Sequence, residues 1–192
     1  MRTLLSLRCV LYKIPEGVKV IVKLDTVVLR AFRADDLGFV FSGLSHPDVI
    51  KYYGISYTTQ LACEEQMRWY QSIAEHGTGY WLVIESQSTK EKLGALGLNN
   101  ICHEHKNAEL GYWLLPQYWG KGVMREALRG LLNFAFNELK LHRLSAEVEL
   151  ENLKSQQLLQ VLGFSSEGVR RECEVKNEKY ISLIHYSLLS DE

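Results

Sequence analysis

The sequence contains no hydrophobic run long enough to cross a lipid bilayer, and neither sign of charge is in excess. A membrane-spanning helix needs about 20 consecutive apolar residues, so no membrane partner is expected. The 22 Lys and Arg residues and the 23 Asp and Glu residues leave a net charge of −1. Proteins that bind nucleic acids usually carry a basic excess, so no nucleic-acid partner is expected either.

Proline is scarce, with three residues in the chain, and no Pro/Ser-rich stretch, low-complexity tract or internal repeat interrupts the sequence. Such stretches usually mark the linkers between domains. Residues 25–192 are therefore predicted to form one domain, preceded by an N-terminal extension of residues 1–24. Within the extension, β-rich residues at 9–14 and 18–24 flank Pro15-Glu16-Gly17, which predicts a β-hairpin.

Cysteine occurs at four scattered positions and never as a Cys-x-x-Cys pair. The four are Cys9, Cys63, Cys102 and Cys173. This scatter predicts free thiols and a cytoplasmic location, because disulfide frameworks belong to oxidising compartments. His103 and His105 lie close together in an expected turn, but no second pair of ligands has a standard spacing. No metal is therefore expected.

Hydrophobic periodicity predicts a mixed order of strands and helices. Helices are expected at 37–44, 61–76, 121–139 and 152–162. Strands are expected at 9–14, 18–24, 27–33, 80–85, 93–102, 108–115, 143–150, 164–172 and 180–188. This order predicts an α/β (mixed α+β) fold with a central mixed β-sheet and helices on both of its faces.

The most informative segment surrounds Gly120 and Gly122. An apolar strand ends before Pro116, a short loop carries the two glycines, and a helix follows. The start of a helix presents unpaired N–H groups, and glycine lets a ligand approach the backbone closely. The segment therefore predicts a binding site for an anion, typically a phosphate or pyrophosphate. The loop is too short for a P-loop and lacks the three glycines of the dinucleotide fingerprint.

The pattern Gln117-x-x-Gly120-x-Gly122 resembles the acyl-CoA pyrophosphate loop of the GNAT family of N-acetyltransferases. Three longer stretches resemble the RimJ/RimL-like branch of that family: LRAFRADDL at 29–37, AELGYWLLPQYWGKG at 108–122 and ENLKSQQLLQVLGFSSEG at 151–168. The likeness covers residues 27–188, in order and at the family's spacing. It implies the GNAT fold, in which acetyl-CoA lies in a V-shaped splay between central strands.

By this resemblance, acetyl-CoA is the cosubstrate. The backbone of Trp113, Leu114 and Leu115 would pair with its pantetheine arm, and an N–H group near Leu114 or Leu115 would polarise the thioester carbonyl. Asn152 would cap a helix and also contact the pantetheine arm, near Ser155. The pyrophosphate would be bound by the loop and the helix start, which comprise Gln117, Trp119, Gly120, Lys121, Gly122, Val123 and Met124.

Acetyl transfer to an amine needs a neutral amine, a stabilised oxyanion and a proton for the leaving thiolate. The resemblance assigns the last task to Ser155. Glu109 is predicted to be the base, because strand alternation places it on one face with Gly111 and Trp113, where it could border the substrate cleft. A solvent-facing glutamate is the alternative, and an amine that arrives deprotonated needs no strong base. The reserve bases are Glu85 and Tyr80.

The predicted function is acetyl-CoA-dependent N-acetylation of a primary amine by direct attack in a ternary complex. The expected acceptor is a protein N-terminal α-amine, as for ribosomal proteins in this branch, and a polyamine or an aminoglycoside is the alternative. Residues 52–59 and the loop at the last strand are expected to select the acceptor. An aromatic wall could be built there by Tyr52, Tyr53, Tyr57, Trp69 and Trp81, with core packing as the alternative for most of them. A non-catalytic CoA-binding module and a scaffold without CoA are the other classes of function. A homodimer is a further expectation, since homodimers are common in this branch.

Overall fold

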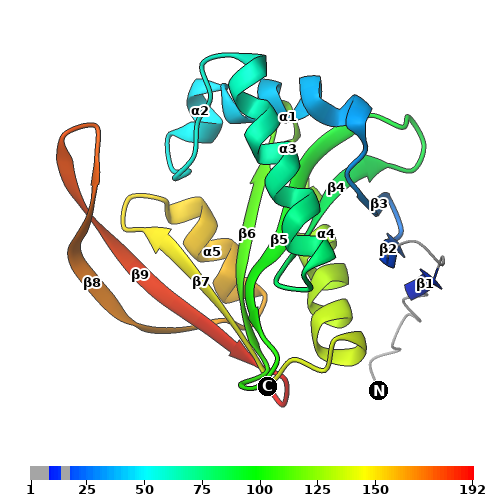
Figure 1. Cartoon of the computed structure of the whole chain (residues 1–192). Coiled ribbons are helices and arrows are strands. Elements are labelled where there is room, and N and C mark those ends of the chain that lie inside the picture. The colour runs from blue at the N-terminus through cyan, green and yellow to red at the C-terminus, as the bar shows by residue number, and fades with distance from the viewer. Residues whose placement is uncertain (1–8, 14–17) are drawn as a thin grey trace.

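One β-sheet organises the computed structural model, which describes residues 9–13 and 18–192 (Figure 1). Its strands follow the order β1-β2-β3-β4-β5-β6-β7-β9-β8. They are β1 (Cys9–Lys13), β2 (Val18–Lys23), β3 (Val27–Ala31), β4 (Tyr80–Ser86), β5 (Lys92–Cys102), β6 (Asn107–Leu114), β7 (Arg143–Glu149), β8 (Ser165–Lys176) and β9 (Lys179–Leu189). Neighbours pair antiparallel except β6 and β7, which run parallel. The predicted mixed sheet is confirmed, whereas the turn predicted at 15–17 lies outside the described residues.

Helices cover both faces of the sheet, as predicted. They are α1 (Leu37–Leu44), α2 (Pro47–Ile50), α3 (Gln60–Glu75), α4 (Val123–Asn133) and α5 (Leu153–Val161). Strand alternation divides the buried side chains into two clusters. On β6, Leu110 and Leu114 belong to the cluster under α4, whereas Trp113 belongs to the cluster under α1 and α3. None of the helices in the described ranges is both long and apolar enough to span a bilayer.

Two helical details differ from the sequence predictions. The helix expected at 121–139 begins at Val123. Gly122 has a φ of 78°, in the left-handed region, so it cannot be part of a right-handed helix. Its last turn, Phe134–Glu138, is a π-helix. The short helix α2 was not predicted, because its four residues are too few to show a helical period.

Strands β6 and β7 separate part-way along their length. Their parallel pairing joins Asn107 to Arg143, Ala108 to Leu144 and Glu109 to Ser145, and it ends there. Beyond this point β6 continues to Leu114 and β7 continues to Glu149, and the two strands diverge (Figure 1). The sheet therefore opens into a V between these two strands.

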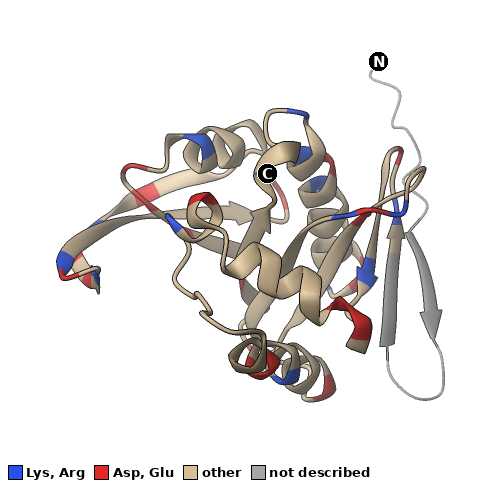
Figure 2. Cartoon of the chain, turned by 90° about the horizontal axis from the view of Figure 1, so that it is seen from above, with Lys and Arg blue, Asp and Glu red and all other residues tan. Residues whose placement is uncertain are grey.

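Strands β8 and β9 form a long hairpin that extends outward from the sheet (Figures 1 and 2). Lys176 donates from Nζ to the carbonyl oxygen of Lys51 at 2.6 Å and pairs with Oε1 of Glu149 at 2.5 Å. One lysine thus connects the hairpin tip, the end of α2 and the end of β7. Figure 2 shows that basic and acidic residues are interspersed over the molecule, in keeping with its net charge of −1.

A buried ion-pair network joins β3 to the helical layer. Asp36 has no exposed surface and accepts two hydrogen bonds from the Arg30 guanidinium, at 2.7 and 3.0 Å. It also pairs with Lys92 Nζ at 2.6 Å, and Arg30 pairs with Glu85 at 2.6 Å. Burial raises the pKa of Asp36, but the hydrogen bonds from Arg30 and Lys92 outweigh it and lower that pKa to about 2.

This lowered pKa makes the stability of the fold depend on pH. An aspartate in an unfolded chain has a pKa of about 3.9, so acid protonates Asp36 in the unfolded chain first. The stabilisation from Asp36 should be complete above a pH of about 5 and should be lost as the pH falls from about 4 through about 2. Urea unfolding between these values would measure it. The free energy of unfolding should fall less steeply with acid in Asp36→Asn than in the wild type, and equal slopes would contradict the prediction.

Candidate active site

The glycine loop connects the end of β6 to the start of α4. After Leu114, a short 3-10 turn (Pro116–Tyr118) leads to Gly120 and Gly122, whose φ angles are 72° and 78°. An added Cβ at Gly120 would meet no atom within 4 Å. Gly122 is the N-cap of α4, and no side chain caps the helix there. The first N–H groups of α4 are therefore not occupied by a capping side chain. The loop and helix start have the geometry of an anion-binding site.

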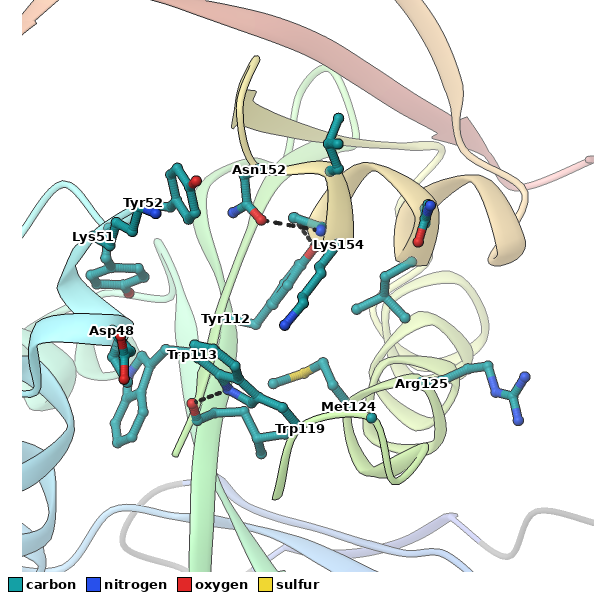
Figure 3. Close-up of a pocket in the computed structure, with 18 of the residues that line it drawn as sticks. Asp48, Lys51, Tyr52, Tyr112, Trp113, Trp119, Met124, Arg125, Asn152 and Lys154 are labelled. Atoms are coloured by element: carbon teal, nitrogen blue, oxygen red, sulfur yellow. Dashed lines mark hydrogen bonds between the residues drawn. The ribbon is translucent and has the colours of Figure 1, made fainter. Parts of the chain in front are cut away.

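A cavity of about 970 Å³ extends from this loop into the V between β6 and β7 (Figure 3). Four elements enclose it: the end of β6, the glycine loop with the start of α4, the start of α5, and α2 with the residues after it. Its lining comprises Asp48, Val49, Lys51, Tyr52, Tyr53, Tyr112, Trp113, Leu114, Trp119, Gly120, Gly122, Met124, Arg125, Glu151, Asn152, Leu153, Lys154, Ser155, Gln157, Leu158 and Val161.

The backbone of β6 faces the cavity at alternate residues. The Leu115 N–H donates to Leu93 of β5 at 3.0 Å, and Leu114 lies opposite Gly94. In an antiparallel pair, hydrogen-bonded and non-bonded positions alternate. The backbone groups of Leu114, and of Tyr112 two residues earlier, therefore point away from β5 and into the V. This corrects the sequence prediction, since the backbone groups of Trp113 and Leu115 face β5 instead.

Trp119 closes one side of the cavity. Its indole Nε1 donates to the Leu114 carbonyl at 2.7 Å (Figure 3). The Lys154 ammonium lies 5.0 Å from the centre of the Trp119 ring, within the range of a cation–π contact. The loop and the start of α5 are thus in contact across the mouth of the cavity, with positive charge beside the loop.

The start of α5 carries polar groups that line the cavity. Asn152 is the N-cap of α5, and its Oδ1 accepts from the Ser155 N–H at 3.2 Å. This leaves the Asn152 amide nitrogen free to donate elsewhere. The Ser155 hydroxyl lies 2.6 Å from the Tyr112 hydroxyl. Burial raises the pKa of Tyr112 to about 12.

A protein-family model described as an acetyltransferase (GNAT) domain matches residues 26–165, which is well over half of the chain. The chain belongs to the GNAT acetyltransferase family. The uncharacterized N-acetyltransferase p20 of Bacillus licheniformis is 32% identical to it over 169 residues, which cover 88% of this chain and 95% of p20.

Solved GNAT structures share the fold. The Vibrio cholerae spermidine N-acetyltransferase, in complex with CoA and spermine, superposes with a TM-score of 0.78 and 25% identity over 86% of this chain and 96% of that chain. RimL, a ribosomal L7/L12 α-N-protein acetyltransferase, superposes with a TM-score of 0.82 and 20% identity over 94% and 99% of the two chains. The predicted GNAT fold is confirmed, and the protein is an acyltransferase enzyme.

Most of the predicted cofactor-binding residues come together in the GNAT domain. Those that line the cavity are Trp113, Leu114, Trp119, Gly120, Gly122, Met124, Asn152 and Ser155. Leu115, Gln117, Lys121 and Val123 are absent from the lining. Gln117 and Lys121 are exposed on the loop, and the Lys121 ammonium lies over the Tyr118 ring at 5.8 Å.

The predicted bases lie away from the cavity. Glu109 shares a face with Gly111 and Trp113, as predicted, but it sits at the closed end of the V, where its exposed carboxylate accepts from Asn100 at 3.0 Å. Its environment is that of the solvent-facing alternative. Neither reserve is nearer: Glu85 pairs with Arg30, and the Tyr80 ring packs edge-on against Phe134.

Several site residues were missed by the sequence reasoning. Tyr112 was given no role, because no sequence signal connects it with Ser155, 43 positions away. Asp48 and Lys51 line the cavity from the segment around α2. Of the predicted aromatic wall, Tyr52 and Tyr53 line the cavity, whereas Tyr57, Trp69 and Trp81 do not. An amphipathic period could not reveal α2, since the helix has a single turn.

Proposed function

We propose that this protein transfers the acetyl group of acetyl-CoA to a primary amine by direct attack in a ternary complex. The observation that carries the proposal is the continuous path from the glycine loop to Ser155. Along this path the helix start offers N–H groups, and the backbone groups of Tyr112 and Leu114 point away from β5. CoA is a long molecule with an anionic end and an amide-containing arm, and the path presents complementary groups in that order.

The expected position of acetyl-CoA follows from these groups. The pyrophosphate would accept from the N–H groups at the start of α4, with Arg125 and Lys154 supplying positive charge nearby. The amides of the pantetheine arm would form hydrogen bonds with the backbone of Tyr112 and Leu114, which β7 no longer pairs with at this point. The free amide of Asn152 would add a hydrogen bond from the other side. The Trp119 indole N–H donates to the Leu114 carbonyl, so this hydrogen bond would have to break before the pantetheine arm could use that carbonyl.

Ser155 would act at the leaving group. The amine nitrogen attacks the thioester carbonyl carbon, so a C–N bond forms and the C–S bond breaks. The Ser155 hydroxyl gives its proton to the departing sulfur, and the amine gives up a proton to solvent, which restores the hydroxyl. The products are the acetylated amine and the free CoA thiol. An N–H group of the β6 backbone would stabilise the oxyanion, and one well-aimed donor contributes roughly 3 kcal/mol. The bases considered above lie outside the cavity, so the amine would attack after losing its proton to water.

A protein N-terminus is the acceptor that the site favours. A polyamine carries several positive charges, whose recognition calls for a surplus of carboxylates. The cavity lining contains two carboxylates, Asp48 and Glu151, against three cationic side chains, Lys51, Arg125 and Lys154. Because Arg125 and Lys154 are assigned to the pyrophosphate, two carboxylates and one lysine remain for the acceptor. This small negative surplus suits an acceptor with one amine better than a polycation. A small amine is the second candidate, because the Vibrio cholerae relative is a spermidine N-acetyltransferase.

The free thiols of Cys63, Cys102 and Cys173 fit a reducing cytoplasm.

Thiol release from acetyl-CoA would test this proposal. The assay would compare N-terminal peptides, polyamines and aminoglycosides as acceptors, and we expect turnover with the peptides. In parallel, saturating CoA should stabilise the fold by a few kcal/mol, measured as a rise in Tm. A rise in Tm without any turnover would favour a non-catalytic CoA-binding module. An unchanged Tm would rule out both the enzyme and the module.

A further inference from the structure

We propose that Tyr112 is a positioning residue for the reaction: its hydroxyl donates to Ser155 and so directs the Ser155 proton at the departing CoA sulfur. This inference rests on the proposed function, in which Ser155 protonates the leaving thiolate. It adds a second residue on a different element of the fold. The two residues come from β6 and α5, which flank the V.

The contact is short and direct. Tyr112 Oη and Ser155 Oγ are 2.6 Å apart, close to the shortest distances found for hydroxyl pairs (Figure 3). Within the described part of the chain, Ser155 is the sole hydrogen-bond partner of the Tyr112 hydroxyl. Both residues line the cavity, so the pair lies at the wall where the thioester would be held. The hydroxyl contact therefore belongs to the site, while the Tyr112 ring packs against the buried core.

The direction of the hydrogen bond follows from the chemistry of the two groups. A phenol is a stronger donor and a weaker acceptor than an alkyl hydroxyl, so Tyr112 donates and Ser155 accepts. A serine hydroxyl has one proton and two lone pairs. With one lone pair occupied by Tyr112, the Ser155 proton must point elsewhere, and the cavity is the open side. The raised pKa of Tyr112 keeps this donor protonated at neutral pH.

The same hydrogen bond would help Ser155 as it reacts. When Ser155 releases its proton to sulfur, negative charge develops on Oγ. A donor at 2.6 Å stabilises that charge more strongly than it stabilises the neutral hydroxyl. The interaction is therefore stronger in the transition state than in the ground state, which is the condition for lowering the barrier. Removing it should reduce kcat and leave the binding of acetyl-CoA unchanged.

A double-mutant cycle tests this role. Tyr112→Phe keeps the ring and removes only the hydroxyl, and we expect kcat to fall about tenfold with KM for acetyl-CoA unchanged. The double variant Tyr112→Phe/Ser155→Ala should be no slower than Ser155→Ala alone, because the tyrosine acts through the serine. Tyr186→Phe is a matched control. Tyr186 is buried on β9 and does not line the cavity, so its variant should keep the wild-type kcat.

The outcomes separate this inference from the proposed function. A wild-type kcat in Tyr112→Phe, together with a loss in Ser155→Ala, would overturn the inference and leave the role of Ser155 intact. Additive losses in the double variant would also overturn it, since the two hydroxyls would then act independently. A wild-type kcat in Ser155→Ala would overturn the proposed role of Ser155 itself. An equal CoA-induced rise in Tm in all variants would show that the losses do not come from impaired binding.

Discussion

Ser155→Ala should lower kcat for acetyl transfer by about a hundredfold, at the low end of the range for a general acid. The hydroxyl lies at the start of α5, on the wall of the cavity, and its backbone N–H is already held by the Asn152 side chain. Alanine keeps that backbone contact, so the helix cap and the binding of CoA should survive. Steady-state thiol release would show the loss in kcat, and a thermal shift with CoA would show the preserved affinity.

A matched serine supports this interpretation. Ser72 is also helical, in α3, and it is exposed and lies outside the cavity lining. Ser72→Ala should therefore keep both the wild-type kcat and the wild-type Tm. A comparable loss in Ser72→Ala would trace the effect to folding. An unchanged kcat in Ser155→Ala would mean that the thiolate leaves without a proton from this residue, and the proposed mechanism would fail.

Asp36→Ala should destabilise the fold by about 3–5 kcal/mol, the cost of breaking a buried ion pair by removing one partner. The Arg30 guanidinium, with 7% of its side chain exposed, would lose two hydrogen bonds while keeping its contact with Glu85. Lys92 would lose its contact with Asp36 as well. For a chain of this size, a loss of this magnitude lowers Tm by roughly 6–20 °C, which calorimetry or urea unfolding would measure.

The neighbouring aspartate provides the control. Asp35 precedes Asp36 in the same turn, but its side chain is exposed, and Lys92 contacts only its backbone carbonyl. Asp35→Ala should change the free energy of unfolding by no more than about 0.5 kcal/mol. Equal effects of the two substitutions would contradict the importance of the buried network. Turnover per folded molecule should stay the same in both variants, because the network lies outside the cavity lining.

The sequence predicted the fold well because the relevant signals are local. The apolar helical pattern at 37–44 and the loop signal of Gly120 and Gly122 each depend on a few neighbouring residues. The structure places α1 and the glycine loop at these positions. Asn152 was predicted as a helix cap for the same reason, and its side chain caps α5. Element boundaries were less certain, as the later start of α4 shows, because a positive φ at one glycine decides it.

The site was predicted less completely because its geometry depends on contacts between distant segments. Alternation along β6 correctly placed Glu109 on the same face as Trp113. Alternation predicts which face of the strand a residue occupies, but it does not predict how far that residue lies from the closed end of the V. Glu109 therefore lies on the expected face and at the wrong end. The contact between Tyr112 and Ser155 depends on how β6, β7 and α5 meet, and no local pattern contains that information.

The strand order has a consequence for how the chain acquires its structure during synthesis. Strand β9 lies between β7 and β8, and it pairs with β7 from Leu183 to Leu189. Until β9 leaves the ribosome, β7 has an unpaired edge along its whole length, and exposed edges promote aggregation. A nascent chain stalled before residue 183 would hold the glycine loop and α5 but would lack the strand that supports β7. The site should therefore become competent only after β9 has left the ribosome and paired with β7.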